Sequence, residues 1–159
     1  AEKAKEVITD LAKKLPFDHV QQVSRVSVSS EGLKAYHTQH GHAAGGLYHY
    51  ETKIMTLPGN ERGARHAFVH EVGHGVFHHI YESKLGWQVK NLYHHRLDQW
   101  NENKRIQRFV SDYARTEDSE EFFCECYSAY INEPDTLWMI DKEMYRLLDQ
   151  NVFGRSVSK

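Results

Sequence analysis

The stretch from residue 66 to residue 79 constrains this chain more than any other. It reads HAFVHEVGHGVFHH and contains the pattern His-Glu-x-x-His, formed by His70, Glu71 and His74. On an α-helix, residues four apart lie one turn apart on the same face, so both imidazoles can reach a single cation. The apolar neighbours predict a helix, from about residue 61 to residue 81, that is buried on more than one side.

Two imidazoles and a glutamate at this spacing match the chemistry of a zinc ion. Zinc favours four ligands, and a catalytic site keeps one of them for water. We therefore expect His70 and His74 to bind one Zn²⁺, and Glu71 to take a proton from the water that the metal activates. Gly73 and Gly75 are poor helix formers, which predicts that something packs closely against this turn. The alternative is a helix in which Glu and His merely alternate, because the chain has 12 histidines.

A catalytic zinc ion needs a third protein ligand. The three-histidine pattern H-E-x-x-H-x-x-G-x-x-H would place Gly at 77 and His at 80, where the chain has Phe77 and Ile80. The sequence therefore excludes that class and favours the class that takes a glutamate from a later helix. A closed, structural zinc site would instead need a fourth protein ligand, for which His66 is the candidate.

A later segment, from residue 113 to residue 131, reads YARTEDSEEFFCECYSAYI. Together with H-E-x-x-H and the upstream stretch AAGGLY at residues 43–48, it resembles the zincin peptidases of the anthrax lethal factor catalytic-domain type, whose relatives include bacterial Pro-Pro endopeptidases. The resemblance covers about residues 43–132. It implies a zincin-like fold and a zinc peptidase activity with a glutamate as third ligand.

The same resemblance implies roles for individual residues of this segment. Glu121 would be the third zinc ligand, and Tyr113 would stabilise the oxyanion of the reacting carbonyl. The spacing from Tyr113 is one residue longer than the family pattern, which leaves Glu120 as the alternative ligand. Glu125, one turn after Glu121, could support a metal ligand. Other readings are a capping box of Asp118 with Glu121, and a Tyr113 that is only packed at a helix end.

A hairpin precedes the predicted metal-binding helix. Two β-prone runs, residues 47–50 and 53–57, surround a short turn at Glu51 and Thr52. An extended peptide could pair with an exposed edge at residues 45–49, which makes Gly45, Gly46 and Leu47 candidates for the substrate-binding strand. An ordinary sheet strand is the alternative reading.

The remaining pattern predicts an α+β fold, with a small mixed or antiparallel sheet packed on the zinc-binding helix and a helical C-terminal half. We expect a helix at residues 2–15, strands within residues 20–28 and 34–38, a helix at 119–131 and a last helix after Pro134. The length of 159 residues suits a single metallopeptidase domain, sheet-containing over residues 1–60 and mainly helical over 61–159.

Composition narrows the classes of partner. A net charge of -2 argues against a general nucleic-acid binder, and no apolar run approaches the length of a membrane span. Cys124 and Cys126 are too close on a helix to form a disulfide, so we expect two thiols. The N-terminus lacks the apolar core of a secretory signal, and we expect a soluble protein. A secreted protein and a module of a larger toxin or phage-associated protein both fit this composition, and the oligomeric state stays open.

These observations predict a zinc-dependent endopeptidase that acts on a protein or peptide substrate. Its mechanism would use a metal-activated water with Glu71 as general base. The alternative is a non-catalytic zinc-binding interaction domain on the same scaffold.

Overall fold

The computed structural model describes residues 2–34 and 45–155. The chain divides into two units, residues 1–76 and 77–159, and the boundary falls inside helix α4 (Glu61–Ile80). Each unit is described by itself below. Among the described helices, none combines the length and the apolar character that crossing a bilayer requires.

The first unit begins with the predicted amphipathic helix, α1 (Glu2–Lys14). Its apolar residues Val7, Ile8 and Leu11 are buried, while the lysines and glutamates between them stay exposed. Helix α2 (Phe17–Val20) follows Pro16 and occupies the start of the region predicted as a strand from Val20. The strand itself, β1 (Arg25–Val28), is shorter than that prediction. Of the predicted strand at 34–38, residue 34 is helical and the rest lies outside the described residues.

The predicted hairpin is confirmed. Strands β2 (Leu47–His49) and β3 (Ile54–Leu57) pair antiparallel, with His49 opposite Ile54, and the turn between them contains Lys53 at a φ of 56°. Strand β1 pairs parallel with β3, so the described sheet is mixed and has the order β1-β3-β2. Strand β2 is therefore an edge strand of the described sheet.

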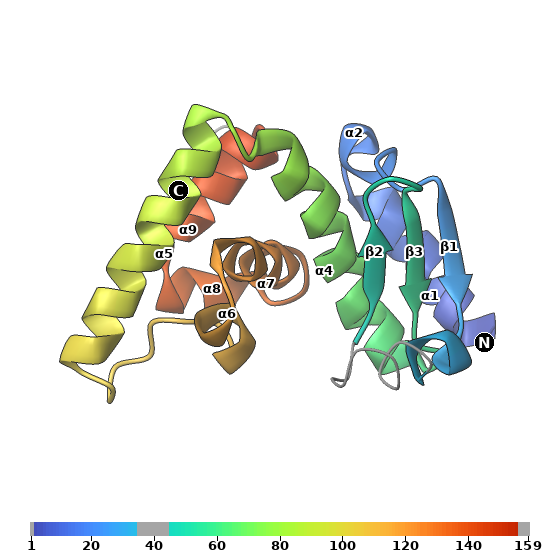
Figure 1. Cartoon of the computed structure of the whole chain (residues 1–159), viewed down its shortest axis with the longest axis horizontal. Coiled ribbons are helices and arrows are strands. Elements are labelled where there is room, and N and C mark those ends of the chain that lie inside the picture. Colours follow the sequence, from blue (N-terminus) through green and yellow to red (C-terminus); the bar gives the residue numbers. More distant parts are fainter. Residues whose placement is uncertain (1, 35–44, 156–159) are drawn as a thin grey trace. The chain divides into compact units, whose positions relative to one another are not determined.

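Helix α4 packs against this hairpin within the first unit (Figure 1). A Cβ atom at Gly75 would lie 3.0 Å from Cβ of Gln22 and 3.5 Å from the hydroxyl oxygen of Tyr48. Only a glycine fits such an approach without displacing its neighbour, which confirms the close packing predicted from the glycines of this helix. The helix also buries Phe68, Val69 and Val72.

The second unit is helical in its described part. It consists of α5 (Lys84–Glu102), α6 (Asp112–Thr116), α7 (Ser119–Asn132), α8 (Pro134–Ile140), α9 (Lys142–Leu147) and the π-helix η1 (Leu148–Val152). Aromatic rings fill its core, among them the pair Phe77 and Phe123, whose centroids are 5.4 Å apart. The predicted combination of a small mixed sheet with a helical C-terminal half is thus confirmed.

Two boundaries in this unit differ from the sequence prediction. Helix α4 ends at Ile80, close to the expected end, but a further helix that was not predicted begins directly after it, where the Ser83 side chain accepts a hydrogen bond from the Gly86 amide and caps the start of α5. The single helix predicted after Pro134 is interrupted at Asp141, which caps α9 through the Met144 amide. In both cases a polar side chain that can serve either end of a helix begins a new one.

Candidate metal centre

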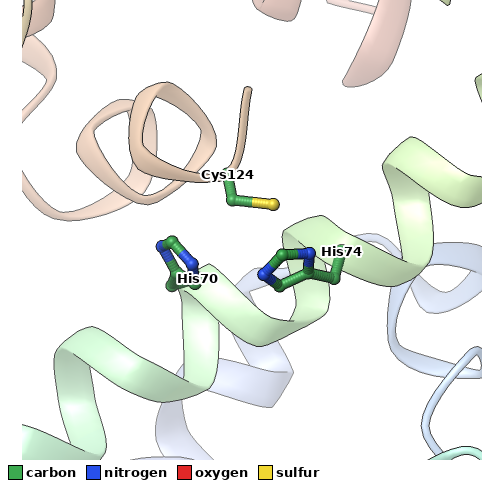
Figure 2. Close-up of side chains that lie close together, drawn as sticks. All are labelled: His70, His74 and Cys124. Carbon is green, nitrogen blue, oxygen red and sulfur yellow. The ribbon is translucent and has the colours of Figure 1, made fainter. Parts of the chain in front are cut away.

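His70 and His74 lie one turn apart on α4, as the sequence predicts. Their ring centroids are 5.1 Å apart, and one ring nitrogen of each lies within 4.8 Å of the other. Figure 2 shows both rings on the same face of the helix. Nitrogens that lie this near to each other could take part in holding one metal ion.

Glu71 is buried beside the second of these histidines. Only 6% of its surface is exposed, and its Oε2 atom lies 3.9 Å from Nε2 of His74. The buried position follows from the helix, because Val69 and Val72 on either side are fully buried as well. The first unit therefore brings His70, Glu71 and His74 together.

Tyr50 contributes a contact to this group that sequence reasoning missed. Its hydroxyl oxygen lies 3.3 Å from Nδ1 of His74, and the two rings stand nearly perpendicular. The available signal was the alternation in the run Leu-Tyr-His-Tyr, since Tyr48 and Tyr50 are two apart and share one side of an extended segment. Both tyrosines indeed contact α4 or its histidines.

The predicted substrate strand lies next to the predicted general base. A Cβ atom at Gly46 would lie 3.1 Å from Cγ and Oε1 of Glu71 and 3.1 Å from Cβ of Ala67. Gly45, by contrast, faces open space, with nothing within 4 Å of such an atom. Leu47 begins the edge strand β2 directly after them. The backbone at Gly46 can therefore approach Glu71 only because it carries no side chain.

His66 lies one turn before His70 and forms a second histidine pair. The ring centroids of His66 and His70 are 6.0 Å apart, and a nitrogen of each lies within 4.8 Å of the other. His66 is exposed, whereas His70 is 7% exposed. Helix α4 therefore carries three imidazoles on successive turns that could take part in binding a cation.

In the second unit, Tyr113 lies on the short helix α6 and is 47% exposed. The α6 helix is capped by the Ser111 side chain, which accepts from the Ala114 amide. The same Ser111 hydroxyl donates a hydrogen bond of 2.8 Å to the buried carboxylate of Glu125 on α7. Glu125 thus braces the cap of the helix that carries Tyr113, a link that the sequence did not reveal.

Glu120 and Glu121 lie in the first turn of α7 and are half-buried. The Asp118 side chain accepts a hydrogen bond of 2.9 Å from the Glu121 amide, which is the Asp118 half of the capping box that was the alternative reading of Glu121. This cap uses the backbone amide of Glu121. The metal-binding role of its carboxylate stays a prediction.

The two cysteines of α7 are buried thiols, as predicted. Cys124, the third side chain labelled in Figure 2, lies three residues after Glu121 and one before Glu125. It therefore shares a face of α7 with Glu121. Burial raises the pKa of the Cys126 thiol well above its usual value, which keeps that sulfur protonated and a poor ligand.

The described residues thus include histidine, glutamate and cysteine side chains that could bind a metal ion. Comparison of the chain with models of protein families, with curated proteins and with solved structures gave no significant match.

Proposed function

We propose that this protein is a zinc-dependent endopeptidase of the zincin type. The observation that carries the proposal is the arrangement on α4, where His70 and His74 bring ring nitrogens within 4.8 Å of each other beside the buried Glu71. The resemblance of the segments around residues 70 and 121 to zincin peptidases points to the same activity.

Each residue of the first unit would have a distinct task. A zinc ion held by His70 and His74 would polarise the scissile carbonyl and lower the pKa of a water molecule. Glu71 would take the proton at a carboxylate oxygen and return it to the leaving amine.

Strand β2 supports the choice of a peptide substrate. It is an edge of the described sheet, and Gly46 next to it approaches the Glu71 side chain closely. An extended peptide that pairs with this edge would align its backbone with the residues of α4. The side chains of the bound peptide would then point to opposite faces in alternation, so that every second one could contact the protein.

The resemblance to zincin peptidases suggests the remaining groups. We propose Glu121 as the third ligand, with Glu120 as the alternative, and Tyr113 as the donor that stabilises the oxyanion. The exposed phenol of Tyr113 is held on a helix whose cap is tied to the buried Glu125. Glu125 would therefore position Tyr113 by fixing Ser111.

Metal stoichiometry and cleavage test the proposal together. We expect the protein to retain one zinc ion after gel filtration, as measured by elemental analysis, and to cut members of a peptide library. The His74→Ala variant should retain no zinc, whereas His95→Ala, which removes an exposed histidine of α5, should retain it. Loss of zinc from both variants, or from neither, would contradict the assignment.

Separate variants decide the third ligand. Glu121→Gln should weaken zinc binding more than Glu120→Gln, Glu125→Gln or Cys124→Ser, as measured by competition with a chromophoric chelator. If neither Glu121→Gln nor Glu120→Gln weakens it, the likeness of this helix to that of zincin peptidases is misleading.

A second candidate function is favoured by His66. Because His66 and His70 also have nitrogens within 4.8 Å of each other, α4 could contribute to a closed zinc site without turnover. In that case His66→Ala would weaken zinc binding strongly, and no peptide would be cut. Under the peptidase proposal the same variant keeps its zinc and its activity.

A further inference from the structure

The contact between Tyr50 and His74 distinguishes the two nitrogens of that imidazole. The Tyr50 hydroxyl oxygen lies 3.3 Å from Nδ1, while Nε2 lies 3.9 Å from Oε2 of Glu71. One nitrogen therefore faces the strand side, and the other faces the predicted general base. Nε2 therefore lies on the side of the ring that faces Glu71, where the proposed metal ion would bind.

A neutral imidazole carries a hydrogen on only one of its two ring nitrogens. A lone pair on Nε2 that can bind a metal therefore requires the hydrogen to be on Nδ1. Histidines that bind metals almost always donate this hydrogen to an acceptor, which fixes both the tautomer and the orientation of the ring. A tyrosine hydroxyl oxygen can accept such a bond.

Tyr50 is held in place to do this. It follows β2 directly, and its ring stands at 88° to that of Tyr48, with centroids 5.4 Å apart. Tyr48 is itself fixed, because its hydroxyl donates a hydrogen bond to the carbonyl oxygen of Gln22. The hairpin thus supports the Tyr50 ring next to the helix that carries His74.

We infer that Tyr50 is a positioning residue, whose hydroxyl accepts a hydrogen bond from Nδ1–H of His74 and keeps Nε2 available for the metal. The inference rests on the proposed function in that it takes His74 as a zinc ligand. Loss of such a partner typically costs about 10–100-fold in metal affinity. Because 3.3 Å is long for a hydrogen bond, we expect about tenfold in this protein.

A pair of tyrosine variants tests the inference by zinc affinity. Tyr50→Phe should weaken zinc binding about tenfold in a chelator competition at fixed pH, with little change in Tm. Tyr48→Phe is the matched control. It removes the hydroxyl of a neighbouring tyrosine, which donates to Gln22 and not to His74. It should lower Tm and leave the zinc affinity within about twofold, because it removes a backbone partner only. Equal zinc affinity of Tyr50→Phe and wild type would overturn the inference.

The tautomer of His74 provides a readout that a merely structural role would not move. Long-range ¹H–¹⁵N NMR spectra should show more Nδ1–H tautomer of His74 in the metal-free wild type than in metal-free Tyr50→Phe, and an unchanged tautomer in Tyr48→Phe. An equal tautomer population in all three proteins would refute the inference. These spectra need no metal, so they decide the role of Tyr50 even if wild type binds no zinc, an outcome that would overturn the proposed function instead.

Discussion

The two units of this protein both bury charged or polar residues, but the buried groups differ in kind. In the second unit, Arg96 and Asp141 are buried together and joined by two hydrogen bonds of 2.8 and 2.9 Å. The hydrogen bond to Asp141 is the main reason that the pKa of the Arg96 guanidinium is raised. A cation and an anion that neutralise each other in this way explain their own burial.

In the first unit, the buried polar groups on α4 are an imidazole and a carboxylate. His70 and Glu71 are 7% and 6% exposed, and they lie beside His74, whose nitrogen is 3.9 Å from the Glu71 carboxylate. Two imidazoles and a carboxylate are ligands and bases rather than a cation with its anion. The comparison teaches that the Arg96–Asp141 pair accounts for its own burial, and we expect it to contribute to stability. A buried carboxylate beside two imidazoles is instead what the proposed metal site requires.

The largest expected effect comes from Glu71. Glu71→Gln keeps the size of the side chain but removes its basicity, so turnover of a cleavable peptide should fall by about 10²–10⁴-fold. Zinc content and Tm should stay as in wild type. Glu61→Gln, an exposed change in the first turn of the same helix, is the control and should cut normally. Cleavage by Glu71→Gln at the wild-type rate would contradict the proposed role of Glu71 as general base.

Asp141→Asn tests the other side of the comparison. Asparagine can still cap α9, but it leaves the buried Arg96 with only the exposed Glu143 as its anion, which should cost about 3 kcal/mol of unfolding free energy. Denaturant unfolding measures this cost, and zinc affinity of the folded variant should be unchanged. Asp135→Asn, on the exposed first turn of α8, should stay close to wild type. A stable Asp141→Asn would mean that the pair does not hold the second unit together.

If the protein binds zinc as proposed, removal of the ion should destabilise it to a smaller extent. A ligand at 100 times its Kd stabilises the native state by about 2.7 kcal/mol, so a chelator should lower Tm measurably. The His70→Ala variant provides the control, because its Tm should not respond to the chelator. An equal response of the two proteins would show that the chelator does not act through α4.

The sequence predicted best those elements whose signal is local. Helix α4 and the hairpin β2–β3 each follow from periodicity or from one short motif, and both are confirmed. The starts of α5 after Ser83 and of α9 after Asp141 were not predicted, because a capping side chain looks alike at either end of a break. Which helix it serves depends on where the chain turns.

The candidate site was predictable in its residue types but not in its contacts. The spacing of His70 and His74 places both imidazoles on one face of a helix, with Glu71 next to His70 in sequence, and this needs no tertiary information. The approach of Tyr50 to His74, and that of Gly46 to Glu71, join residues 24 and 25 positions apart in sequence. Such contacts depend on how the hairpin lies on the helix, and the alternation of the strand indicates only the side that faces it.

Gly46→Ala offers the finest test of the first unit. The added methyl would lie 3.1 Å from both Cγ and Oε1 of Glu71, so either the strand or the carboxylate must move. A shift of this kind misplaces the general base, and we expect turnover to fall about tenfold while zinc stays bound. Gly45→Ala is the matched control, since the neighbouring position has open space around it. Because both variants carry the same added methyl one residue apart, a difference in turnover between them reports the contact with Glu71. If both variants cut as wild type does, the close approach of the strand to Glu71 has no part in catalysis.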